Sequence, residues 1–235
     1  MPAEVFHALV FWLPAFLFST TVHEAAHATA ALRLGDPTAY LAGQVSLSPW
    51  PHVRRAPIGM LIVPLLTSLT QGLTIGWAHT PFGAEWADRH PRRTALMSLA
   101  GPLGNLGLAA TAFALIQVGL ALGAFEPPQT ATLQHLVLNA LPPDAMQAGD
   151  YVAEALSVML ALNTLLFVFN LFPLPPLDGA LVFTLALPRD AARSVRRAIA
   201  APGLSFVGLV AAWQLFPALA ARVMTVVVAL LYPRT

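Results

Sequence analysis

The chain has 235 residues, of which 57% are hydrophobic and only 10% are charged, and its formal net charge is +1. This composition is far more apolar than that of a soluble domain, so it predicts an all-α polytopic membrane protein in a lipid bilayer. The absence of cysteine excludes a thiol nucleophile, a disulfide framework and a cysteine-ligated metal, and no basic run indicates a nucleic-acid partner.

The first apolar segment, residues 5–33, is long enough to cross a bilayer and contains the motif His23-Glu24-x-x-His27. An ionisable side chain at this depth is costly and is functional by default. On a helix, His23 and His27 lie one turn apart on the same face, so their ring nitrogens can converge on one zinc ion. Glu24 lies beside them, where it can take a proton from water at the metal. The motif predicts a zinc hydrolase; the alternative is a buried helix whose polar residues bond only to one another.

The segment Tyr40–Ser48 has side chains that alternate between two sets, one richer in apolar residues and the other in polar or small ones. Alternation of this kind predicts a small β-hairpin or sheet near residues 40–50. Such a strand would either hold an unwound substrate by strand addition or form a plain surface hairpin, and the sequence favours neither.

Residues 57–77 are apolar enough to enter the bilayer, but arginines flank them on both sides. Pro64, Gly72 and Gly76 disfavour a straight spanning helix. We expect this segment to be re-entrant from the cytoplasmic side. The alternative is an ordinary helical hairpin, which would give about six helices in total.

Three further apolar segments predict spans at residues 94–123, 151–188 and 199–222 or beyond, which makes about four spans with the first. Arg222 lies inside the last stretch and either snorkels to the interface or marks the end of the span. Most other arginines cluster in three loops, whereas residues 123–155 contain four acids and no arginine. By the positive-inside rule the arginine clusters are cytoplasmic and the acidic loop is outside.

A third metal ligand is needed, and the segment 170–179 offers Asp178. The segment reads Asn-Leu-Phe-Pro-Leu-Pro-Pro-Leu-Asp-Gly. Its prolines break the helix, and irregular backbone at membrane depth is tolerated only where it lines a cavity or the protein interior. Asp178 and His27 both lie towards the cytoplasmic side of their spans, which places them at similar depth. The alternative is a proline kink with an incidentally buried aspartate.

These two motifs together resemble those of the site-2 protease family of intramembrane zinc metalloproteases. Shorter matching sequences lie between them at residues 43–47, 76–78 and 100–105. The resemblance covers about residues 10–190. It implies Glu24 as general base and Asn170 as the residue that steadies the oxyanion or the substrate backbone. It implies three ligands for one zinc ion per chain: His23, His27 and Asp178.

The resemblance also implies an activity, the hydrolysis of peptide bonds within or near transmembrane segments of membrane-protein substrates (regulated intramembrane proteolysis). We expect residues 1–235 to form a single integral-membrane metalloprotease domain, with a catalytic core at about 5–190 and a C-terminal span at about 199–232. It would be a minimal member, without an inserted peptide-binding or C-terminal regulatory domain. We expect it in the cell membrane of a bacterium or archaeon, with its active site towards the cytoplasm.

Two other functions use similar residues. A divalent-cation transporter would also need intramembrane histidine and aspartate, but the sequence shows no internal repeat. A catalytically inactive zinc-binding scaffold would typically have lost Glu24 or a ligand. We expect neither His52 nor His79 to bind metal, and Asn105 to join helices rather than to contact substrate. Nothing in the sequence indicates the substrate or the oligomeric state.

Overall fold

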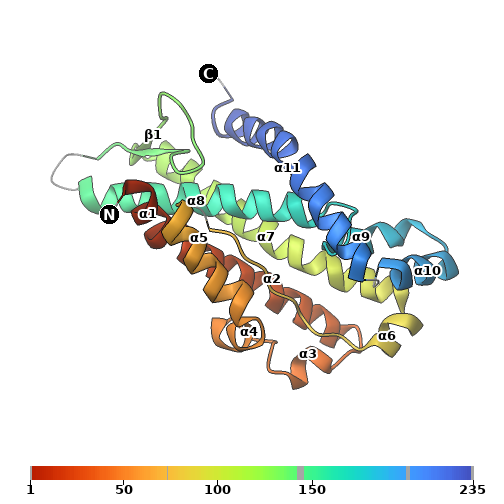
Figure 1. Cartoon of the computed structure of the whole chain (residues 1–235). Coiled ribbons are helices and arrows are strands. Elements are labelled where there is room, and N and C mark those ends of the chain that lie inside the picture. Colours follow the sequence, from red (N-terminus) through yellow and green to blue (C-terminus); the bar gives the residue numbers. More distant parts are fainter. Residues whose placement is uncertain (1, 73, 142–145, 200–201, 234–235) are drawn as a thin grey trace.

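The computed structural model describes residues 2–72, 74–141, 146–199 and 202–233, and these are mostly helical (Figure 1). The α-helices of the N-terminal half are α1 (Ala3–His7), α2 (Leu13–Arg33), α3 (Thr38–Leu41), α4 (Pro49–Arg55), α5 (Val63–Gln71), α6 (Ala84–Arg89) and α7 (Pro91–Ala121). Those of the C-terminal half are α8 (Met146–Asn170), α9 (Asp178–Val182), α10 (Arg189–Ile199) and α11 (Pro202–Leu231). The antiparallel strands β1 (Phe125–Glu126) and β2 (Leu138–Asn139) pair in the loop between α7 and α8.

Within the described residues, four helices are long and apolar enough to cross a membrane, which confirms the predicted all-α membrane fold. They are Ala3–Arg33, Pro91–Ala121, Ala148–Asn170 and Gly203–Leu231. The first of them is continuous, because a π-helical turn at Ala8–Trp12 joins α1 to α2.

One of the predicted span boundaries is wrong. The third span ends at Asn170 rather than near residue 188, because the three prolines of residues 173–176 interrupt the backbone hydrogen bonding of the helix. The chain resumes as the short α9 and a 3-10 turn at Phe183–Ala186. The fourth span continues to Leu231, so that Arg222 lies inside α11 and does not mark its end.

Residues 58–71 form one short helix, made of a π-helical turn at Ile58–Ile62 and α5. These 5 and 9 residues extend roughly 21 Å at 1.5 Å per residue, less than the ~30 Å of a bilayer core. Gly72, at φ +63°, ends the helix in the left-handed conformation that glycine adopts without strain. The chain then returns along α2 as an extended segment, residues 74–83, in agreement with a re-entrant element rather than two spans (Figure 1).

The predicted hairpin near residues 40–50 is wrong. Thr38–Leu41 is a helical turn, Gly43 is at φ +71°, and no described residue pairs with residues 42–48 as a strand. Side chains hold this loop instead, because Gln44 donates to the Pro51 carbonyl and His52 lies 2.9 Å from the Ser46 carbonyl. Alternating side chains are compatible with a single β-strand, but a strand needs a hydrogen-bonded neighbour, and none of the described residues pairs with this segment.

The helix α7 lies between α2 and α8 and packs most extensively against both (Figure 1). Gly104 permits a close approach to α2, since a Cβ atom there would lie only 3.4 Å from the Cβ of Ala26. A core of small and branched residues joins the other end of α7 to α8. By contrast, only 11% of the most apolar 18-residue stretch of α11 is buried, so most of the surface of this helix faces outwards.

Candidate active site

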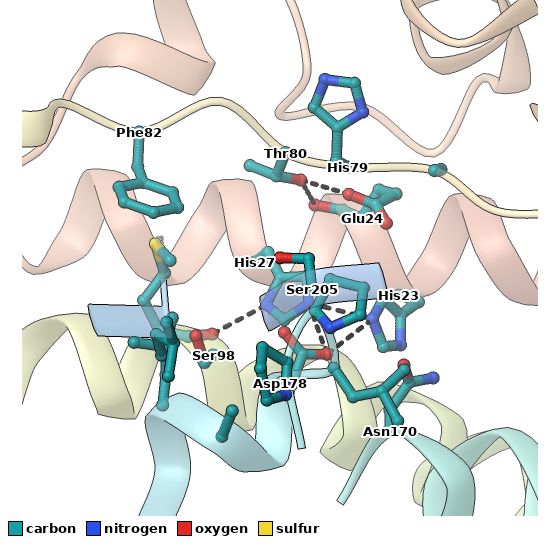
Figure 2. A pocket seen from close by; sticks show the side chains of 18 of the residues that line it. His23, Glu24, His27, His79, Thr80, Phe82, Ser98, Asn170, Asp178 and Ser205 are labelled. Atoms are coloured by element: carbon teal, nitrogen blue, oxygen red, sulfur yellow. Dashed lines mark hydrogen bonds and ion pairs between the residues drawn. The ribbon is translucent and has the colours of Figure 1, made fainter. Parts of the chain in front are cut away.

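His23 and His27 of α2 meet Asp178 of α9 in the interior of the bundle (Figure 2). The two Nε2 atoms lie 2.9 Å apart. Asp178 Oδ2 is 3.1 Å from Nε2 of His23 and 3.2 Å from Nε2 of His27. The helical spacing of the histidines makes them share a face, and the prolines before Asp178 return the chain to that face. The structure therefore brings together the three residues predicted as metal ligands.

This triangle of donor atoms fits a zinc ion. Two imidazole nitrogens and a carboxylate oxygen are the donor set of many catalytic zinc sites, and tetrahedral ligands at about 2.0 Å from the metal lie about 3.3 Å from one another. Gly101 of α7 makes room for the two rings, because a Cβ atom there would lie within 2.6 Å of His23 Nε2 and closer still to His27 Nε2. His23, His27 and Asp178 are thus able to hold one such ion.

The other ring nitrogen of each histidine has a partner on α7. His27 Nδ1 donates to the backbone carbonyl of Met97 at 2.8 Å, and His23 Nδ1 lies 2.6 Å from Asn105 Oδ1. A carbonyl accepts only, so the His27 proton is on Nδ1 and its Nε2 lone pair is free for a metal. Asn105 joins helices as expected, but one of its bonds is to a predicted ligand.

Glu24 is buried beside the three donors, and its carboxylate is held by Thr80 (Figure 2). The Thr80 hydroxyl donates to Oε2 at 2.6 Å and lies 3.0 Å from the Glu24 backbone carbonyl. Sequence reasoning missed Thr80, because it belongs to no motif. The only local signal is that it follows the Gly-Trp-Ala sequence at residues 76–78.

The extended segment 74–83 that carries Thr80 is fixed at both ends. The Trp77 amide donates to the Gly59 carbonyl at 3.0 Å, and the Gly83 amide donates to Asp36 Oδ2 at 2.7 Å. Burial raises the pKa of Asp36, but hydrogen bonds from the Thr38 hydroxyl and the Gly83 amide outweigh it and lower that pKa. Asp36 is therefore an ionised anchor for this segment.

A cavity of about 300 Å³ opens beside the three donors. Asn170 lines it, and its Nδ2 donates to the Leu166 carbonyl of its own helix at 3.0 Å. Further lining residues come from the extended segment, from the Pro175–Asp178 loop and from the α10 and α11 region. The cavity is thus lined by several helices and by one extended segment.

The other histidines are not among the three donors. His79 lines the cavity, but its ring points away from the donors (Figure 2). His52, on α4, is buried against the Ser46 carbonyl. His7 pairs with Glu154 at the opposite end of the bundle, and His135 packs near it in the 122–140 loop.

Comparison with known proteins gives a family. The model of peptidase family M50 matches residues 11–213, which is most of the chain. The chain belongs to peptidase family M50. This confirms the resemblance to the site-2 proteases seen in the sequence. No solved structure gives a significant match.

Two curated relatives are similar to this M50 chain. "Putative zinc metalloprotease YwhC" of Bacillus subtilis (strain 168) is 32% identical over 165 residues, which are 69% of this chain and 63% of the relative. "Putative zinc metalloprotease Rip2" of Mycolicibacterium smegmatis is 26% identical over 181 residues, which are 76% of this chain and 58% of the relative. The chain therefore spans less than two thirds of the length of either relative.

Proposed function

We propose that this protein is a zinc metalloendopeptidase that hydrolyses peptide bonds within or near transmembrane segments of membrane-protein substrates. The observation that carries the proposal is the meeting of three donor atoms, 2.9–3.2 Å apart, beside a buried glutamate in one cavity of a four-span bundle. The family and the names of both relatives support it. His23, His27 and Asp178 are the proposed zinc ligands.

The roles of the remaining residues follow from their positions. A zinc ion held by the three ligands would lower the pKa of coordinated water and polarise the scissile carbonyl. Glu24, whose carboxylate Thr80 holds at the cavity, takes the proton of the attacking water and passes it to the leaving amine. Asn170 lines the same cavity and is the proposed contact for the oxyanion or the substrate backbone. His23, Glu24 and His27 are buried, so the interactions that they make are stronger than in solution.

A transmembrane helix protects its own peptide bonds, so the substrate must unwind before attack. The extended segment 74–83 is the proposed surface for the unwound chain, because it lines the cavity through residues 78–80 and 82. Strand addition along this segment would align the scissile bond with Glu24. This replaces Tyr40–Ser48, which the structure does not place on the cavity.

The test begins with zinc content, because it needs no substrate. Detergent-purified wild type and Glu24→Gln should each contain about one zinc ion per chain, whereas His23→Ala and Asp178→Ala should lose it. His135→Ala is the matched control and should keep zinc, since His135 lies outside the site. Cleavage of quenched fluorescent transmembrane peptides in proteoliposomes should then be present in wild type and absent in Glu24→Gln.

The other outcomes point to other functions. Wild type without zinc after metal-replete purification, or Asp178→Ala with undiminished zinc, would contradict the metal centre. Zinc binding without cleavage across a broad set of transmembrane peptides would favour the inactive scaffold. Zinc-dependent uptake into vesicles would favour a transporter.

A further inference from the structure

A network of hydrogen-bonded, buried polar side chains extends from His23 through Asn105 of α7 to Asn163 of α8. Asn105 Oδ1 lies 2.6 Å from His23 Nδ1, and Asn105 Nδ2 lies 2.9 Å from Asn163 Oδ1. Asn163 Nδ2 lies 2.9 Å from Ser19 Oγ and 2.9 Å from the Met159 carbonyl oxygen. Asn105, Asn163 and Ser19 are each 0% exposed. Burial of two amides among apolar helices costs free energy, so we expect these residues to have a structural or functional role that offsets this cost.

Backbone carbonyls fix the direction of the hydrogen bonds that link Asn163, Asn105 and His23. The Met159 carbonyl accepts only, so it faces the amide nitrogen of Asn163 and turns Asn163 Oδ1 towards Asn105. Asn105 must then present its own nitrogen, and the Ser19 carbonyl, 3.4 Å from that nitrogen, requires the same orientation. Asn105 Oδ1 is left facing His23.

The consequence reaches the metal centre. Because Asn105 Oδ1 accepts, His23 Nδ1 carries the ring proton, and Nε2 keeps its lone pair for a metal. If the Asn105 amide turned over, its N–H groups would face His23 Nδ1 and favour the tautomer with a proton on Nε2. That tautomer cannot bind a metal through Nε2.

We propose that Asn163 is a positioning residue of the metal centre, which acts through Asn105 to hold His23 in its metal-binding tautomer. The inference rests on the proposed function, since it requires His23 to be a zinc ligand. Asn163 touches no predicted ligand itself and belongs to none of the sequence motifs. Of its hydrogen bonds, only the one from Asn105 leads on to a ring nitrogen of a predicted ligand, because the others are to Ser19 Oγ and to Met159 of its own helix.

The test is a mutant cycle on zinc affinity, measured on the full-length protein in detergent by competition with a chelator. Asn105→Leu should weaken zinc binding by about 10- to 100-fold, the usual effect of losing a partner of a ligating histidine. Asn163→Leu should weaken it roughly 10-fold by the same route. In the Asn105→Leu background, Asn163→Leu should have little further effect, because the hydrogen bond that links Asn163 to the His23 ring through Asn105 is already lost.

Two more variants separate positioning from packing. Asn163→Asp in its neutral form, which burial among apolar helices favours, can donate its hydroxyl to the Met159 carbonyl while its other oxygen accepts from Asn105, so it should retain a zinc affinity close to that of the wild type. Ser157→Ala is the matched control: Ser157 is equally buried on α8 but bonds to the backbone of the 136–137 segment. It should lower the unfolding temperature and leave zinc affinity unchanged.

Two results would overturn the proposal while leaving the metal centre intact. One is undiminished zinc affinity in Asn163→Leu, and the other is an equal loss of zinc affinity from Asn163→Leu in the wild-type and the Asn105→Leu backgrounds. If Asn163→Leu does not fold, Asn163→Ala gives the same comparison without added bulk. Wild type that binds no zinc at all would instead contradict the proposed function. The two failures are thus distinct.

Discussion

A Cβ atom at position 101 would lie within 2.6 Å of His23 Nε2 and closer to His27 Nε2, so only glycine leaves both rings in place. We therefore predict that Gly101→Ala moves at least one ring and loses zinc, with the metal content of purified protein as the measurement. The same helix offers a control, because a Cβ atom on Gly107 would have no neighbour within 4 Å. Gly107→Ala should keep zinc and gain up to about 1 kcal/mol of helix stability. Normal zinc content in Gly101→Ala would show that the donor triangle is misplaced.

Thr80 gives a prediction about rate rather than metal content. Its hydroxyl is 2.6 Å from the Glu24 carboxylate, and a hydrogen bond to a charged group contributes about 1.5–3 kcal/mol. Thr80→Val removes the hydroxyl and keeps the shape, so we expect kcat for a cleaved transmembrane peptide to fall about 10-fold with zinc content unchanged.

Thr80→Ser is the control for that experiment, because it restores the hydroxyl and should recover most of kcat. A change in KM alone would indicate that Thr80 contacts substrate and does not position Glu24. Loss of zinc in Thr80→Val would instead assign it a role in the fold of the metal centre.

The first half of α11 contacts the rest of the chain near the Asp178 loop. A Cβ atom on Gly208 would collide with the Pro175 carbonyl, and Phe216 packs on Phe169 with ring centroids 4.9 Å apart. At the other end of α11, Gln117 of α7 donates to the Leu231 carbonyl, and Leu231 is buried in the core between α7 and α8. This helix is thus attached at two places, one of which is the loop that carries a proposed ligand.

We predict that Gly208→Ala separates α11 from that loop and costs about 1–3 kcal/mol, as overpacking of a close contact does. Thermal unfolding in detergent should show a lower midpoint. The matched variant is Gly203→Ala on the same helix, where a Cβ atom would meet nothing within 4 Å. An equal midpoint for the two variants would show that the close contact with Pro175 does not hold α11.

Some features of these helices and loops could be predicted from the sequence, and others could not. The His-Glu-x-x-His spacing fixes a helical face without tertiary information, and helix-breaking prolines mark the region of Asp178. Thr80 and Asn163 were not predictable, because their partners lie 56 and 58 residues away in sequence and depend on how the segments cross. The alternation at Tyr40–Ser48 misled because a strand also needs a partner, which the chain does not supply there.

Two of the arginine clusters, residues 89–93 and 189–197, meet at one end of the bundle. Arg189 donates to the Arg89 carbonyl, and Asp88 forms ion pairs with Arg196 and Arg197, so α6 and α10 are joined. The acidic loop that contains β1 and β2 lies at the opposite end (Figure 1). This polarity supports a proposed orientation with α6, α10 and the nearby metal centre on the cytoplasmic side.

The orientation can be tested cleanly because the chain has no cysteine, so that a single introduced thiol is the only site for a maleimide. Gln129→Cys lies on the exposed surface of the acidic loop, and Ser194→Cys lies on the exposed face of α10. We predict that a membrane-impermeant maleimide labels Gln129→Cys on intact cells and labels Ser194→Cys only after permeabilisation. The cysteine-free wild type is the blank for both. The reverse pattern would place α10 outside the cell. The positive-inside rule would then have failed for this chain, because the joined arginine clusters of residues 89–93 and 189–197 would be extracytoplasmic.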